Sequence, residues 1–171
     1  KNDEVGLVVK TNLAKNCLMD REAVMQKMKH LVNKTKDTKC KVYLLHGDMT
    51  DEEIHSLYNH SKLKAMVSLP HGEGFGLPMF EAAYSGMPIV ATGWSGQLDY
   101  LVDENSKEQF YNVSYDIQPI QNNAVWDGVL IKEAMWSFPR ESSAKTQMRR
   151  CYEDVCEGRG IASTSRQYAK E

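Results

Sequence analysis

Short apolar runs alternate with amphipathic stretches along the first hundred residues of the chain. Four runs rich in aliphatic and β-branched residues predict strands, at 4–9, 41–45, 64–69 and 88–92. Three stretches with apolar side chains at helical spacing predict helices, at 20–35, 50–61 and 78–85. Strands that alternate with helices favour a parallel sheet covered on both faces. The pattern therefore predicts an α/β fold with a doubly wound, Rossmann-like parallel sheet.

The second half of the chain has a weaker pattern. Residues 95–102 predict a short helix capped by Ser95, and residues 108–115 predict a further strand. Residues 127–157 predict two C-terminal helices broken near Pro139, because proline interrupts helical hydrogen bonding. The sequence shows no repeat or flexible linker, so residues 1–171 are predicted to form a single domain. Four apolar residues form the predicted buried stripe of the first helix: Val24, Met28, Leu31 and Val32.

Composition narrows the classes of function. With 42% hydrophobic and 26% charged residues, the sequence matches an ordinary globular domain. A net charge of -2, from 21 basic and 23 acidic residues, gives no broad basic surface for nucleic acid. The four cysteines have no CxxC spacing and are expected to be free thiols, and no apolar stretch approaches the ~20 residues of a membrane span. Because the first residues lack the apolar core of a signal peptide, a cytoplasmic protein is expected.

The stretch HGEGFGLP directly follows the predicted strand at 64–69. In an open parallel sheet, ligands bind beyond the carboxyl ends of the strands. Three of its residues permit a positive φ and a close backbone approach to a ligand: Gly72, Gly74 and Gly76. Pro78 suits the first helical position, and Gly86 is expected to end the helix. The N–H groups of residues 75–77, at a helix N-terminus, therefore predict a small site for an anion or a hydroxyl.

Two glutamates accompany these glycines, Glu73 in the loop and Glu81 one turn into the predicted helix. Carboxylates accept two hydrogen bonds at once and so suit vicinal hydroxyls. Together with backbone donors for phosphate, they predict binding of a sugar nucleotide. The alternative interpretation is that Glu73 is solvated and that Glu81 only complements the helix dipole, which contributes about 0.5 kcal/mol.

The glycine stretch is neither GxGxxG nor GxxxxGK[ST], which disfavours a dinucleotide loop and excludes a P-loop. Instead, EGFGLPMFE followed by SGMPIVATGWSG closely resembles the nucleotide-sugar-binding half of retaining glycosyltransferases of the glycogen-synthase-like, GT-B type, which carry an E-x7-E signature. The segments GDMTDEEIHSLY and MWSFPRESSAKTQMRRCYED are similar to other parts of that half. The resemblance implies that the chain is the C-terminal half of a GT-B enzyme. It also implies an N-terminal acceptor-binding domain in the same full-length protein.

The resemblance assigns roles to the residues of the motif. Glu73 is expected to face the donor sugar as a catalytic residue, and Glu81 to hold the nucleotide ribose. Four consecutive residues are expected to contact sugar hydroxyls and phosphates through their backbone: Gly74, Phe75, Gly76 and Leu77. The donor substrate is thus a nucleotide diphosphate sugar.

Two lysines have the spacing of the phosphate-clamping pair of that family. Lys10 and Lys15 follow the first predicted strand, and the resemblance gives them a catalytic role at the leaving diphosphate. Lys10 stands where the family usually has arginine, so it keeps the charge but loses the planar fork. Gly96 is similar to one of the family's paired glycines after the fourth strand, which implies that it binds the donor near the phosphates. His46 is a weaker candidate for the base pocket, and His71 has no assigned partner.

The resemblance implies transfer of a hexose-like unit to a hydroxyl acceptor with retention of configuration at the anomeric carbon. That scheme requires neither metal nor cofactor, and the sequence has no D-x-D pair for a divalent ion. Only one of the two domains of a GT-B enzyme fits in 171 residues, so the isolated chain is expected to bind donor without transferring sugar. The alternative is a non-catalytic nucleotide-sugar-binding or regulatory module. A flavodoxin-like signalling domain is disfavoured, because the first strand lacks acidic residues at its carboxyl end.

Overall fold

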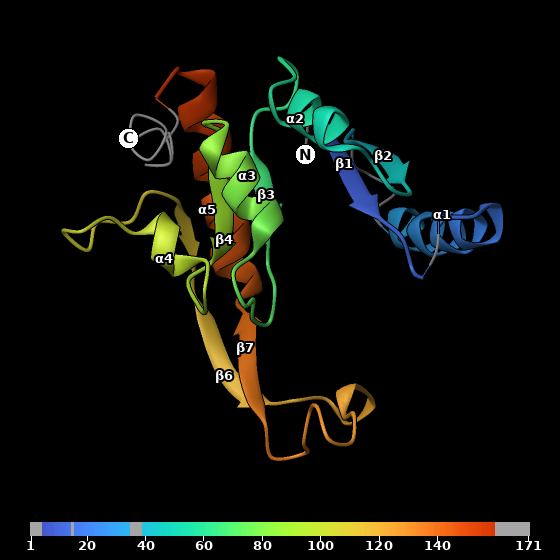
Figure 1. The fold of residues 1–171 in the computed structure, drawn as a ribbon. Coiled ribbons are helices and arrows are strands. Elements are labelled where there is room, and N and C mark those ends of the chain that lie inside the picture. The colour runs from blue at the N-terminus through green and yellow to red at the C-terminus, as the bar shows by residue number, and fades with distance from the viewer. Residues whose placement is uncertain (1–4, 15, 35–38, 160–171) are drawn as a thin grey trace. The chain divides into compact units, whose positions relative to one another are not determined.

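The computed structural model describes residues 5–14, 16–34 and 39–159 and divides into two compact units, Lys1–Asp51 and Glu52–Glu171 (Figure 1). Strands and helices alternate in both units, and each contains a parallel sheet. The predicted α/β, Rossmann-like class is therefore confirmed. No helix among the described residues is long and apolar enough to span a membrane.

The first unit is a strand–helix–strand motif. Strand β1 (Gly6–Thr11) pairs in parallel with β2 (Lys41–His46), and helix α1 (Leu18–Asn33) connects them. The predicted positions of all three elements are confirmed to within two residues at most ends. The predicted buried stripe of α1 is only partly correct, because the buried residues Asp20 and Val24 both lie in its first two turns. Leu31 and Val32, in the last turn, are 62% and 41% exposed.

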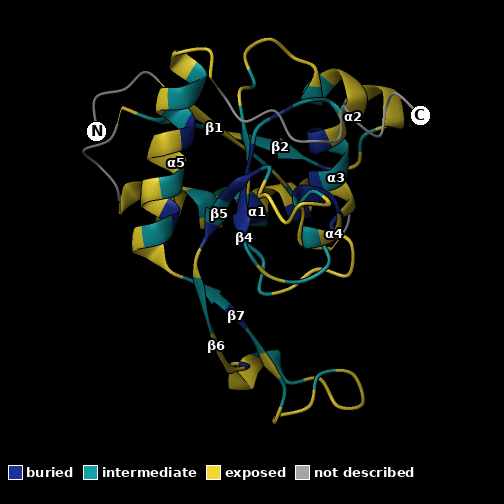
Figure 2. Ribbon diagram, turned by 90° about the vertical axis from the view of Figure 1, so that its left-hand side faces the viewer, coloured by how far each residue is buried: buried dark blue, intermediate teal, exposed yellow. Residues whose placement is uncertain are grey.

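The second unit is built on a three-stranded parallel sheet. Its strands lie in the order β3 (Met66–Ser68), β4 (Ile89–Thr92) and β5 (Tyr111–Val113). Its helices are α2 (Asp51–Tyr58), α3 (Leu77–Tyr84), α4 (Leu98–Leu101) and α5 (Glu141–Cys156). Helix α3 connects β3 to β4, and α4 connects β4 to β5. Strand β4 is fully buried at the centre of the sheet (Figure 2).

Helices cover both faces of this sheet, as the pattern predicts. Neighbouring residues of β4 belong to different hydrophobic clusters, because successive side chains of a strand point to opposite faces. Ile89 packs in the cluster that contains Met79 of α3 and Leu101 of α4. Val90 packs in the cluster that contains Cys151 of α5. The sheet is therefore doubly covered within the second unit.

The C-terminal third of the chain departs from the prediction. Strand β6 (Tyr115–Pro119) and β7 (Met135–Pro139) form an antiparallel hairpin, with a short 3-10 helix, η1 (Asn122–Ala124), in the connection. The first of the two helices predicted within 127–157 is therefore wrong, and a single helix, α5, follows the hairpin. The run MWSFP alternates large side chains with Ser137, a strand pattern that finds its partner across the hairpin. Pro139 ends a strand instead of breaking a helix.

Candidate functional site

Gly76 controls the entry into α3 from the loop that follows β3. It has φ +80° at the N-cap of the helix, a conformation that favours glycine. Its carbonyl oxygen accepts hydrogen bonds from the N–H groups of Met79 (2.9 Å) and Phe80 (3.0 Å) and from the hydroxyl of Tyr100 (3.0 Å). A Cβ on Gly76 would lie 2.8 Å from Met79 Cε and 3.0 Å from the Tyr100 hydroxyl. Both the backbone angle and the space therefore require glycine here.

The other glycines of the loop have different reasons, so the expectation for all three is only partly correct. Gly72 and Gly74 do not have a positive φ. A Cβ on Gly74 would meet nothing within 4 Å, and one on Gly72 would make only ordinary contacts. Gly86 does behave as predicted: it has φ +80°, and the N–H groups of Gly86 and Met87 bond the carbonyls of Ala83 (2.8 Å) and Ala82 (3.0 Å).

The loop after β4 holds the loop after β3 in place. Ser95 Oγ donates to the Glu73 carbonyl (2.7 Å) and accepts from the Glu73 N–H (3.2 Å), while the Gly96 N–H donates to the same carbonyl (3.1 Å). A Cβ on Gly96 would lie 1.9 Å from the Gly74 carbonyl oxygen. Glycine is thus required at 96 by the close contact of two backbones.

The predicted cap at Ser95 is wrong. The N-cap of α4 is Gln97, and Ser95 has φ 82°, in the left-handed region that serine rarely adopts. Its side chain bonds Glu73, 22 residues away, instead of the α4 backbone. A strained residue held by two hydrogen bonds is a feature that clusters at functional sites.

The N–H groups of Phe75, Gly76 and Leu77 make no hydrogen bond to another described residue. Helix α3 begins at Leu77, one residue earlier than predicted, so Pro78 is its second residue instead of its first. The three donors precede or begin an eight-residue helix whose dipole is positive at this end. The side chain of Phe75 turns away toward Phe80 and Tyr100, with ring centroids 5.2 Å from each, so the backbone is what the loop offers to a ligand.

The two glutamates lie near different tyrosines. The Glu73 side chain is exposed, and its negative charge adds to burial in raising the pKa of Tyr100 to about 12. Glu81, half-buried on α3, adds in the same way to burial in raising the pKa of Tyr58. Neither carboxylate has a hydrogen bond to a described side chain among the bonds recorded for residues 5–14, 16–34 and 39–159. Both keep free acceptor oxygens, which is what a hydroxyl ligand requires.

In the first unit, the structure describes only one of the two predicted lysines, and their role at a diphosphate stays a prediction. The Lys10 ammonium donates to the carbonyl of Gly47, just beyond the carboxyl end of β2. Its charge therefore lies where ligands bind in parallel sheets. Lys15 lies outside the described residues.

An acidic residue that the sequence gave no reason to single out organises the same end of the first unit. The Asp20 carboxylate accepts hydrogen bonds from the N–H groups of Leu13 (3.0 Å) and Ala14 (3.1 Å) and lies 2.8 Å from His46 Nε2. These bonds, led by that from His46, hold the pKa of Asp20 below its usual range. The His46 side chain is only 5% exposed and, through Asp20, supports this loop.

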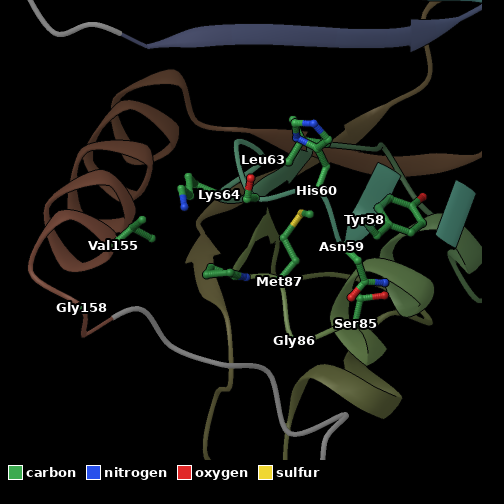
Figure 3. A pocket seen from close by; sticks show the side chains of 12 residues that line it. Tyr58, Asn59, His60, Leu63, Lys64, Ser85, Gly86, Met87, Val155 and Gly158 are labelled. Atoms are coloured by element: carbon green, nitrogen blue, oxygen red, sulfur yellow. The ribbon is translucent and has the colours of Figure 1, made fainter. Parts of the chain in front are cut away.

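A cleft among the described residues of the second unit is shown in Figure 3, and none of its lining residues belongs to the glycine loop. It has a volume of about 370 Å³ and is lined by Tyr58, Asn59, His60, Ser61, Leu63, Lys64, Ser85, Gly86, Met87, Pro88, Val155 and Gly158. Lys64 comes shortly before β3 and Pro88 directly before β4, so the cleft opens at the amino ends of the parallel strands. The glycine loop follows the carboxyl end of β3.

Sequence reasoning missed two residues of this site. Tyr100 was hidden in a segment predicted only as a short helix, although it is 4% exposed and bonds the Gly76 carbonyl. His71 was noted without a partner. Its Nδ1 lies 2.6 Å from the Ser137 carbonyl, and its ring stacks on Trp136 at 4.5 Å. No local signal reveals either contact, because the partners lie 24 and 66 residues away.

Similarity to known proteins agrees with this arrangement. The family described as glycosyl transferases group 1 matches residues 7–120, about two thirds of the chain. That range includes both parallel sheets, the glycine loop and the Ser95–Gly96 segment. No curated protein matches the chain. The chain therefore belongs to the glycosyl transferases group 1 family.

Proposed function

We propose that this chain is the donor-binding domain of a retaining, GT-B-type glycosyltransferase that moves a hexose-like unit from a nucleotide diphosphate sugar to a hydroxyl acceptor. The observation that carries the proposal is the glycine loop, whose three unbonded N–H groups at the start of α3 are held in position by Ser95 and Gly96. Donors fixed before the ligand arrives bind a developing negative charge without having to reorganise. The family supports sugar transfer as the reaction.

Each residue then has a role in binding or transfer. The backbone of residues 74–77 binds sugar hydroxyls and the diphosphate, Glu73 accepts hydrogen bonds from the donor sugar, and Glu81 accepts them from the ribose. As the sugar leaves, negative charge builds on the diphosphate, and the N-terminus of α3 stabilises it. In the first unit, Lys10 and Lys15 are cations of the kind that bind phosphate. Gly96 acts indirectly by holding the loop. The scheme needs no metal ion or cofactor, and it places the acceptor mainly on an N-terminal domain of the full-length protein.

One observation favours the alternative, a module that holds the nucleotide sugar without catalysis. The Lys10 ammonium already donates to the Gly47 carbonyl, which leaves two of its three donors for a phosphate. A lysine also lacks the planar fork that makes arginine a bidentate phosphate ligand. Both features reduce what Lys10 can contribute to the charge on a leaving diphosphate.

The experiment compares Glu73→Ala and Glu81→Ala by isothermal titration calorimetry with UDP, GDP and ADP and with UDP-glucose, GDP-mannose and ADP-glucose. In Glu81→Ala, loss of the ribose contact should weaken the binding of both the nucleotides and the nucleotide sugars about fivefold, since a charge-assisted hydrogen bond contributes about 1 kcal/mol or more. Glu73→Ala should spare the nucleotides and weaken only the sugar-bearing donor. Equal losses for both ligand types in both variants would contradict the assigned roles.

A further inference from the structure

The β6–β7 hairpin extends beyond the carboxyl end of the three-stranded sheet, the end at which the glycine loop also lies (Figure 1 and Figure 2). Ser137 of β7 fastens it there: its N–H and its Oγ both donate to the His71 carbonyl, at 3.0 Å and 2.9 Å, and its own carbonyl accepts from His71 Nδ1. Ser137 is fully buried. His71 directly precedes Gly72, so the base of the hairpin is bonded to the start of the glycine loop.

The outer end of the hairpin is a structured turn. The N–H and carbonyl groups of Trp126 and Leu130 bond each other reciprocally, at 3.0 Å and 2.7 Å, and the Val129 N–H donates to the Trp126 carbonyl at 2.9 Å. Gly128 supplies the positive φ (+77°) that this turn requires. Trp126 is 66% exposed in this turn, an unusual position for a large apolar residue.

The polar side chains of the connection between β6 and β7 are mostly amides and carboxylates, with one lysine, Lys132. Asp127 follows Trp126 in the turn, Glu133 lies on the return path, and the exposed Gln121, Asn122 and Asn123 precede it. A planar indole presents an apolar face with one N–H at its edge. A pyranose ring is complementary to such a surface, since its C–H face is apolar and its hydroxyls bond amides and carboxylates around the rim.

We propose that the tip of the β6–β7 hairpin is a carbohydrate-binding subsite in which Trp126 stacks on a sugar ring of the acceptor. The inference rests on the proposed function in one respect, because that function supplies a hydroxyl-bearing acceptor. Attachment of the hairpin to His71 puts this subsite at the same carboxyl end of the sheet as the glycine loop. The bound sugar is recognised at a distance from the reacting hydroxyl, so the subsite selects extended acceptors.

Charge argues against the other classes of occupant. Between residues 120 and 134 the acidic residues Asp127 and Glu133 outnumber the single basic residue, Lys132. A phosphate-rich surface, whether nucleic acid or anionic lipid, is therefore repelled. Asp127 occupies the turn itself, so the hairpin cannot enter a bilayer tip first without burying a carboxylate.

The test uses the 171-residue chain labelled with 5-fluorotryptophan. The three tryptophans of the chain give separate fluorine signals, which are assigned by replacing one tryptophan at a time. The labelled chain is titrated with maltohexaose, cellohexaose, chitohexaose and laminarihexaose. We expect the Trp126 signal to shift with at least one of them, and Trp126→Ala to weaken that binding at least tenfold by calorimetry. The control Ile131→Ala removes a comparably exposed apolar side chain (58%) and should change the dissociation constant less than twofold.

Different outcomes separate this proposal from the proposed function. If UDP, GDP or ADP binds while none of the four hexasaccharides shifts Trp126, the subsite is overturned and the donor site stands. If a hexasaccharide binds at Trp126 while no nucleotide binds, the subsite stands and the donor site fails. Sedimentation with phosphatidylcholine vesicles, or self-association in ultracentrifugation, that Trp126→Ala abolishes would assign the tip to a membrane or a second copy and overturn the proposal.

Discussion

The two ends of the three-stranded sheet in the second unit are built differently. At the amino ends of β3 and β4 there is a cleft of about 370 Å³, lined by loops and by the end of α5. At the carboxyl ends, the glycine loop is fixed by bonds from Ser95, Gly96 and Tyr100 to its backbone. The cleft offers space, whereas the loop offers donors in fixed positions.

If the proposed function is correct, the cleft is not where the donor binds. A phosphate or a sugar hydroxyl needs hydrogen-bond donors that are already oriented, because orienting them during binding costs conformational entropy. The fixed loop at the carboxyl end also requires two unfavourable features, the left-handed backbone of Ser95 and the close backbone contact at Gly96. The cleft shows no comparable constraint apart from Gly86, which ends a helix.

The largest expected effect is that of Gly96→Ala, which places a methyl group 1.9 Å from the Gly74 carbonyl oxygen. We expect a loss of about 3 kcal/mol in the free energy of unfolding, at the upper end of overpacking effects because the obstacle is backbone. Urea unfolding measures it. The matched control Gly74→Ala, whose Cβ meets nothing within 4 Å, should change stability by about 0.5 kcal/mol or less. Equal effects in the two variants would contradict the close contact of the two loops.

Ser95 allows the strain and the hydrogen bonds to be separated. Ser95→Ala keeps the left-handed strain and loses both bonds to Glu73, so we expect a loss of about 1 to 2 kcal/mol in unfolding free energy. Ser95→Gly also loses the bonds but relieves about 1 kcal/mol of strain, and should be nearer to the unchanged protein. If the alanine variant is as stable as the glycine variant, the strain is not significant.

Tyr100→Phe removes the hydroxyl bond to the Gly76 carbonyl and should cost about 1 kcal/mol. Burial, with the nearby charge of Glu73, raises the pKa of Tyr100 to about 12 in the folded protein, above the value near 10 of an unfolded tyrosine. The neutral phenol therefore stabilises the fold. That contribution is complete below pH 10 and is lost as pH rises from 10 to 12. Between about pH 10 and 12, the free energy of unfolding should fall more steeply with pH for the unchanged protein than for Tyr100→Phe. Parallel curves would mean that Tyr100 ionises freely in the folded state.

The smallest effect is expected at the cleft. Lys64→Ala removes a cation from its lining but touches nothing in the glycine loop. Its dissociation constants for UDP, GDP and ADP should stay within twofold of those of the unchanged protein. A loss of tenfold or more would move the nucleotide from the carboxyl end of the sheet to the cleft.

The sequence predicts what depends on local periodicity or on single-residue geometry. The alternating strands and helices, the positive φ of Gly76 and the helix end at Gly86 all follow from short patterns. It fails where contacts join distant residues. Strand β7 was predicted as helix because its partner, β6, lies some twenty residues earlier, and pairing decides strand formation more than propensity does.

The candidate site divides in the same way. Glycines and glutamates identify the loop, but the bonds of Ser95 to Glu73 join positions 22 residues apart and leave no local pattern. Asp20 looks like an ordinary first-turn acid that complements a helix dipole, although it bonds Leu13, Ala14 and His46. The sequence thus locates the glycine loop, and only the fold shows what holds it.

The most direct test of the donor-loop account is an amide NMR titration of the chain with UDP, GDP and ADP. The account predicts that at least one nucleotide shifts the signals of residues 73–77 and 95–96, while those of the cleft residues 59–64 and 85–87 stay unchanged. Shifts confined to the cleft residues, with the glycine loop unaffected, would contradict it.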